Sequence, residues 1–241
     1  MAYPASETRV IQLRGQVLQY TLVRRKRRSI GLRVDAAGGL TISAPAREPY
    51  THLDQVIVER EAWIVEKIAQ MQAKRLPERK WKSGECLPFL GSELELYLYR
   101  TYTRTDPIRS TGRILVGVPD VQDGEGIKSR VAAWYRRLAQ QHFAERIACL
   151  APRLGVAPPP FKLSEAKTSW GVCTPEGQLR LSWRLIKAPQ EQIDYVVAHE
   201  LAHLRHMDHS RAFWQTVAAI YPDYQRERKA LERDGHRYHT F

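Results

Sequence analysis

Cysteine is scarce in this chain, and long hydrophobic runs are absent. The three cysteines, Cys86, Cys149 and Cys173, are widely spaced and form no CxxC pattern. This spacing indicates neither a disulfide framework nor a cysteine-based zinc site. No apolar run approaches the roughly 18 residues of a membrane-spanning helix, and the first residues do not resemble a signal peptide. We therefore expect a cytosolic (cytoplasmic) protein that has no membrane partner.

Internal repeats and low-complexity segments are also absent. Of the 241 residues, 43% are hydrophobic and 27% are charged, which is typical of an ordered globular protein with one or two domains. Positive charges exceed negative charges by 12, and the excess is spread along the chain apart from a local cluster, Arg24–Arg28. A basic surface of this kind favours a weak association with nucleic acid. The alternative for the cluster is the solvated end of a strand.

Residues 1–125 are expected to form a β-rich N-terminal region with one long helix. Alternating and β-branched residues predict strands at 17–23, 29–34, 40–43, 94–99 and 114–118. We expect the first three strands to form a small antiparallel meander. Apolar residues at helical spacing predict one helix from Thr51 to Lys74, which Thr51 begins and Pro77 ends.

Residues 126–241 are expected to form the catalytic region. Apolar residues at helical spacing predict a helix from Ile127 to about Leu150. Strands are predicted at 161–163, 170–173 and 179–185, and further helices are predicted to begin near Pro189, Arg211 and Tyr224. We therefore assign the chain to the α+β fold class.

The most informative stretch is His199-Glu200-Leu201-Ala202-His203. Positions four apart on an α-helix differ by about 40° around the axis, so the rings of His199 and His203 point at one spot, with Glu200 beside it. Zinc held by three neutral nitrogens keeps its fourth position open for water and lowers the pKa of that water toward about 7. A nearby carboxylate can then take the proton. The stretch therefore predicts a zinc hydrolase with Glu200 as its catalytic base.

Two histidines could supply the third ligand. His206 would lie on the same helix face, but about 4.5 Å further along the axis than His203, and three rings in successive turns do not converge easily on one ion. His209 can serve only if the helix ends and the chain folds back. Asp208 and Ser210 are good N-cap residues for a new helix, so we choose His209. We expect His206 to cap the end of the first helix or to support a ligand.

Three classes of function remain open on this basis. The first is a zinc-dependent peptidase, in which Glu200 is the general base and then the proton donor to the leaving amine. The second is a metal-dependent phosphohydrolase that acts on nucleotides, with the arginine-rich surface holding the phosphates. The third is a non-catalytic nucleic-acid-associated zinc protein, which is disfavoured because no fourth protein ligand is evident. The donor that stabilises the oxyanion is open among Tyr195, Arg184 and Tyr224.

Several short motifs occur in a fixed order between residues 169 and 214. They are Ser169-Trp170-Gly171-Val172-Cys173, Leu181-Ser182-Trp183-Arg184-Leu185-Ile186, Pro189, the His199 to His203 stretch, His209-Ser210 and Phe213-Trp214. In this order they resemble the YgjP-like zincin metallopeptidase family, which is related to the SprT-like and Wss1-like proteases. The resemblance implies that His199, His203 and His209 bind zinc and that Glu200 is the catalytic carboxylate.

The resemblance also implies a minimal zincin-like metallopeptidase domain, in which a strand beside the metal cleft binds an extended peptide or protein substrate. Residues 179–184 are the candidate strand. The chain departs from the family at two positions, because the family usually has Arg in place of Ser169 and Ser in place of Val172. The contact that this Arg makes is therefore open here, whereas the expected metal site is unaffected.

Overall fold

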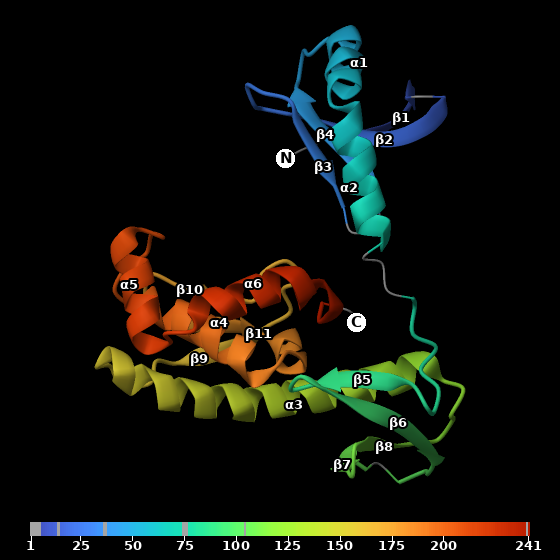
Figure 1. The fold of residues 1–241 in the computed structure, drawn as a ribbon. Helices are drawn as coiled ribbons and strands as arrows, with labels where there is room; N and C mark the ends of the chain where they lie inside the picture. The colour runs from blue at the N-terminus through green and yellow to red at the C-terminus, as the bar shows by residue number, and fades with distance from the viewer. Residues whose placement is uncertain (1–5, 14, 36–37, 74–76, 104, 240) are drawn as a thin grey trace. The chain divides into compact units, whose positions relative to one another are not determined.

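The computed structural model describes residues 6–13, 15–35, 38–73, 77–103, 105–239 and 241. The chain divides into two compact units, Met1–Pro77 and Glu78–Phe241, which are described separately. Both contain helices and small mixed sheets, so the predicted α+β class is confirmed (Figure 1). The observed division falls after Pro77, whereas the predicted one falls after residue 125. The reason is that the helix at the predicted boundary, Gly124–Leu150, shares a core with the sheet that precedes it.

The first unit contains a four-stranded sheet. Its strands are β1 (Ser6–Leu13), β2 (Gln16–Arg25), β3 (Gly31–Val34) and β4 (Leu40–Pro45). The strand order is β1-β2-β4-β3. The predicted antiparallel meander is wrong in one respect, because β4 lies between β2 and β3 and therefore runs parallel to β2. The order in which strands pair depends on how they pack in the core. The alternation of apolar and polar residues within each strand does not reveal that order.

Two helices, α1 (Tyr50–Glu59) and α2 (Glu61–Ala73), complete the first unit where one helix was predicted. The break falls at Arg60, whose φ of −101° and ψ of 11° lie outside the helical values. Apolar spacing does not reveal it, because side chains on both sides of the break enter one core. The predicted cap at Thr51 is also wrong, since α1 begins after Pro49 without a side-chain cap. The predicted end, Lys74, lies outside the described residues.

The second unit begins with another four-stranded sheet. Its strands are β5 (Cys86–Phe89), β6 (Ser92–Arg100), β7 (Ile108–Ser110) and β8 (Arg113–Val118), in the order β5-β6-β8-β7. The long helix α3 (Gly124–Leu150) follows, and its first turn is capped by the side chain of Asp123, which accepts a hydrogen bond from the Gly126 amide. Trp134 of α3 is buried. A short 3₁₀ turn, η1 (Ala151–Leu154), ends this segment.

A three-stranded sheet lies between α3 and the later helices. It consists of β9 (Phe161–Ser164), β10 (Gly171–Cys173) and β11 (Leu179–Ser182), in the order β10-β11-β9. The strand predicted to continue to Leu185 ends at Ser182, and Trp183–Lys187 form a 3₁₀ helix, η2. Neither neighbouring strand extends beyond the position of Ser182, so buried residues after it would lack ladder partners. A 3₁₀ turn provides local hydrogen-bond partners for part of this backbone.

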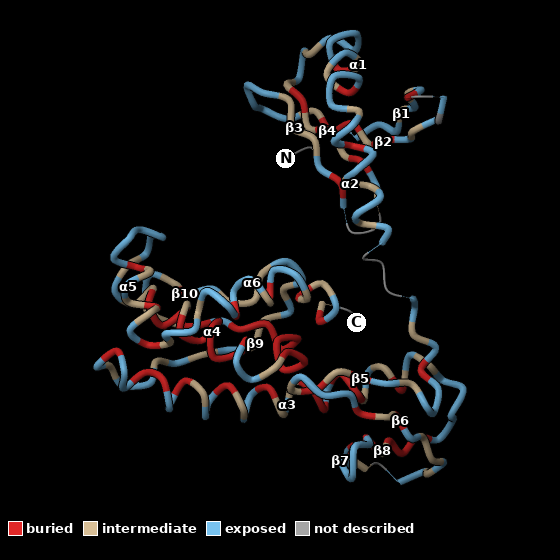
Figure 2. The backbone as a smooth tube through the Cα atoms, in the orientation of Figure 1, coloured by how far each residue is buried: buried red, intermediate tan, exposed pale blue. Residues whose placement is uncertain are grey.

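The last part of the second unit is helical. It contains α4 (Gln190–Ala202), α5 (Arg211–Ile220), α6 (Tyr224–Asp234) and a final 3₁₀ turn, η3 (Gly235–Arg237). Helix α4 contacts α3, α5, α6 and β10, and most of its residues are buried (Figure 2). Within the described residues, every helix is too short or too polar to cross a membrane.

Candidate metal centre

Helix α4 presents His199 and Glu200 from its last turns, and His203 is its C-cap residue. The helix begins after Pro189, which has no N–H to leave unpaired, and it ends where the backbone of His203 leaves the regular hydrogen-bond pattern. The ring centroids of His199 and His203 are 5.0 Å apart. The predicted convergence of two rings spaced four residues apart is therefore observed.

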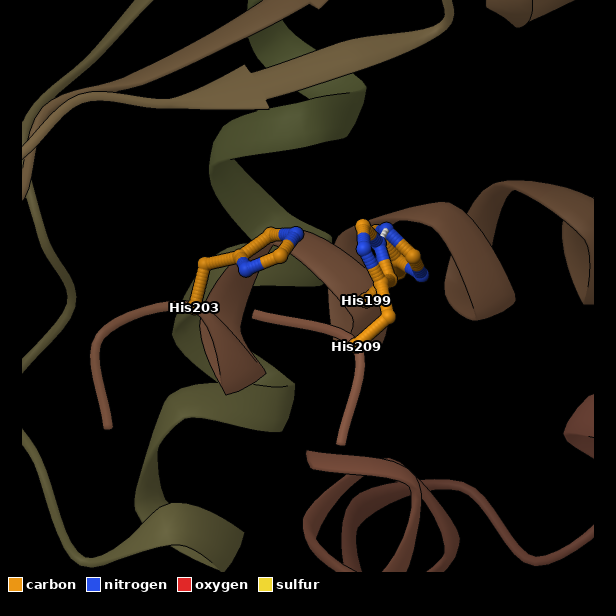
Figure 3. Close-up of side chains that lie close together, drawn as sticks. All are labelled: His199, His203 and His209. Carbon is orange, nitrogen blue, oxygen red and sulfur yellow. Dashed lines mark hydrogen bonds between the residues drawn. The ribbon is translucent and has the colours of Figure 1, made fainter. Parts of the chain in front are cut away.

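The chain then turns back and returns His209 to the other two histidines (Figure 3). Ser210 completes the turn. Its hydroxyl group accepts a hydrogen bond from the Phe213 amide and so caps the N-terminus of α5. The predicted break between the two helices is thus confirmed. The Nε2 atoms of His209 and His199 are 3.2 Å apart, and one nitrogen from each of the three histidines lies within 4.8 Å of the others.

The donor set fits a tetrahedral metal ion. Bonds of 2.0–2.1 Å at tetrahedral angles separate two ligand nitrogens by about 3.3 Å, close to the 3.2 Å between the Nε2 atoms of His199 and His209. His203 Nδ1 lies 2.9 Å from the main-chain oxygen of His206, and donation to that carbonyl leaves Nε2 as a free acceptor. His206 therefore supports a neighbouring ring through its backbone, and its own ring lies outside the group.

The environment favours the neutral form of His199 and His203, which is the form that binds metals. Burial, together with the nearby rings of His203 and His209, lowers the pKa of His199 to about 3. Burial also lowers the pKa of His203. The ring of Phe213 is fully buried and lies 4.6 to 4.9 Å from all three histidine rings. This apolar support fixes the positions of the rings.

Glu200 is buried beside the three histidines, with 4% of its surface exposed. Burial raises its pKa to about 8, and a hydrogen bond from the Cys173 backbone opposes this rise. Its Oε2 atom has no hydrogen-bond partner among the described residues. A Cβ atom at Gly171 would lie 2.5 Å from Oε1 of Glu200, so only glycine leaves room for the carboxyl group there. This carboxyl group can exchange a proton near neutral pH.

A pocket of about 220 Å³ opens beside His199 and Glu200. Its other lining residues come from β10, α4, α6 and the segment before β10, and they are Trp170, Gly171, Tyr195, Val196, Arg228, Leu231 and Glu232. Sequence reasoning missed Arg228. It lies in a helix where charged residues of both signs alternate, and nothing in that pattern distinguishes it from its neighbours.

The three candidates for the oxyanion donor differ in their position relative to the pocket. Tyr195 lines it, with its ring centroid 6.0 Å from that of His199, and burial raises the pKa of Tyr195 to about 12, so its hydroxyl keeps its proton. Arg184 lies outside it and donates to the main-chain oxygens of Phe241 and Glu165. Tyr224 also lies outside it and stacks on Trp214. Of the three, Tyr195 alone borders the candidate metal centre.

The strand predicted to form the exposed edge, residues 179–184, is central in the sheet, so this prediction is wrong. β11 pairs with β9 on one side and with β10 on the other. β10 lies next to α4, and its outer edge has no strand partner among the described residues. The order of strands in this sheet could not be predicted, because β9 is distant from β11 in the sequence and pairs with it in parallel. The departure at Val172 falls on this edge strand, and its side chain is 49% exposed.

Three comparisons relate the chain to known proteins. The family model of the YgjP-like metallopeptidase domain matches residues 28–234, a range that includes all three histidines and Glu200. No curated protein matches the chain. Among solved structures, the metallopeptidase zymogen abylysin of Pyrococcus abyssi is 24% identical to this chain, with a TM-score of 0.34, over 38% of this chain and 90% of that one. By the match over residues 28–234, the chain belongs to the YgjP-like metallopeptidase family.

Proposed function

We propose that the protein is a zinc-dependent peptidase in which His199, His203 and His209 hold the zinc ion and Glu200 is the general base. One observation carries the proposal: three imidazoles meet beside a buried carboxyl group that has an oxygen without a hydrogen-bond partner among the described residues. Membership of a metallopeptidase family supports it. When bound, zinc would polarise the scissile carbonyl group and lower the pKa of a water molecule.

Glu200 supplies the proton transfers in this proposal. Its unpartnered Oε2 accepts the proton of the attacking water and later gives it to the leaving amine nitrogen. Its raised pKa of about 8 suits both steps, because the group can be charged or protonated near neutral pH. The protonated hydroxyl of Tyr195 donates a hydrogen bond to the developing oxyanion.

The free edge of β10 binds the substrate in this proposal. The oxygen of Trp170 and the amide of Thr174 bond to the β11 side, so the alternating ladder directs the amide and carbonyl groups of Gly171 away from β11. An extended peptide can pair with these groups. Because Gly171 also contacts Glu200, the pairing brings the peptide backbone next to the carboxyl group.

The substitution Glu200→Gln tests the proposed function. The amide has nearly the shape of the carboxyl group but cannot accept the proton of water, so we expect zinc content and folding to be retained. The rate of hydrolysis of an unfolded protein substrate should fall by about 10²-fold or more, because general-base catalysis contributes about that much. Activity near that of the wild type would remove Glu200 from the mechanism.

A further inference from the structure

The pocket beside the candidate metal centre carries a cation at its rim. Arg228 is the one lysine or arginine among its lining residues. The guanidinium group lies over the ring of Trp214, 4.8 Å from its centroid, and Nε donates a hydrogen bond of 2.9 Å to Glu232. Trp214 also lies against the rings of His199 and His209. The stacking therefore holds the positive charge next to the histidine group.

Arg228 lies close to the groups that form the proposed site. The ring of Trp214, over which its guanidinium group lies, is 5.7 Å from the ring of His199 between centroids. Tyr195 lines the same pocket as Arg228. The field of the positive charge therefore extends to the place where a substrate would react.

The present partner of Arg228 can be exchanged. Arg228 and Glu232 are four residues apart on α6, and their side chains are 46% and 62% exposed. Exposed pairs of this kind contribute little to stability, because water screens both charges. A carboxylate held deeper in the pocket would be less hydrated and would form a stronger charge-assisted hydrogen bond with the guanidinium group. Glu232 thus occupies the position that an acidic ligand can take.

We propose that Arg228 binds a carboxylate of the substrate next to the scissile bond, so that the enzyme prefers acidic peptides. This rests on the proposed peptidase function. The volume of the pocket, about 220 Å³, is below the roughly 300–1,000 Å³ of sites that enclose a whole small molecule, so it suits a single side chain or chain end. The carboxylate belongs either to an Asp or Glu side chain or to the C-terminus of a short peptide.

Binding to the zinc-loaded Glu200→Gln protein tests this proposal without turnover. The probe is an alanine-rich decapeptide with one central Glu, compared with the same peptide carrying Gln, each with a free or an amidated C-terminus. We expect the preferred acidic form to bind about tenfold or more tightly than its neutral counterpart, as hydrogen bonds between charged groups predict. A Glu effect identifies a side-chain carboxylate, and an amidation effect identifies the C-terminus.

Three further substitutions in the same Glu200→Gln protein sharpen the test. Arg228→Gln should abolish the preference for the acidic form, and Glu232→Gln should increase it, because the competing carboxylate is removed. Arg233→Gln is the matched control: Arg233 is an exposed, ion-paired arginine of α6 outside the pocket, and its loss should change neither affinity.

Two results would overturn the proposal. One is the absence of any difference between acidic and neutral peptides, including absence of binding, and the other is a preference that survives Arg228→Gln. Failure of the proposed function looks different. In that case the acidic peptide binds through Arg228, but the zinc-loaded wild-type protein hydrolyses neither this peptide nor an unfolded protein.

Discussion

The carboxyl group of Glu200 occupies the space that a side chain at position 171 would need. A Cβ atom there would lie 2.5 to 2.7 Å from three atoms of the Glu200 side chain, which is closer than any relaxed contact. Glycine at this position thus determines where the carboxyl group lies relative to the histidines. The sequence contains Gly171 in a recognisable motif, but its contact with Glu200 depends on β10 lying against α4.

The substitution Gly171→Ala should therefore displace Glu200 and slow hydrolysis by about 10²-fold, which is the loss that a shift of about 1 Å can cause. Zinc content should not change, because the three atoms nearest to the added methyl group all belong to Glu200 and not to a histidine. Gly124→Ala is a matched control, since a Cβ there would meet other atoms only at ordinary distances. Wild-type rates for Gly171→Ala, measured with a zinc-loaded protein, would show that the close contact has no role.

At the scale of elements, the candidate centre depends on the start of one helix and the end of another. The end of α4 at His203 and the start of α5 after Ser210 return His209 to the group. Both signals are local in sequence, namely a four-residue spacing and an N-cap serine, and so they could be predicted. The break at Arg60 and the central place of β11 could not, because they depend on packing between distant segments.

The N-cap of α5 offers a test at this scale. Ser210→Ala removes the hydroxyl that accepts from the Phe213 amide, which should lower the free energy of unfolding by about 1 kcal/mol. Because His209 precedes the cap directly, we also expect weaker zinc binding in a competition titration with a chelator. Thr216→Ala is the control, since the Thr216 hydroxyl bonds only within α5. Equal zinc affinity in the two variants would show that the cap does not affect the metal centre.

At the scale of the whole molecule, the charge excess is spread over both units. The structure reduces the size of the predicted basic cluster, because the Arg24 guanidinium donates to the main-chain oxygens of Pro45, Ala46 and Glu48. The four cations from Arg25 to Arg28 remain exposed. Composition predicted the excess of charge, but it could not show which arginines are used within the fold and which face solvent.

We expect sequence-independent binding to DNA or RNA near 50 mM salt, with an affinity that falls steeply as the salt concentration rises, since each neutralised phosphate releases counterions. Replacing Arg25, Lys26 and Arg28 by Gln should weaken this binding more than replacing three exposed cations of α6, Arg226, Lys229 and Arg233. Fluorescence anisotropy with a labelled oligonucleotide measures both effects. Equal losses of affinity in the two triple variants would show that the cluster is only the solvated end of a strand.

The zinc content of two histidine variants tests the central claim most directly. We predict one zinc ion per chain in the wild type and in His206→Ala, because His206 contributes its backbone oxygen and not its ring. His209→Ala should lose the ion after dialysis against a weak chelator, since two imidazoles remain where three are needed. Metal analysis of the folded proteins gives the answer. Zinc retained by His209→Ala and lost by His206→Ala would contradict the account.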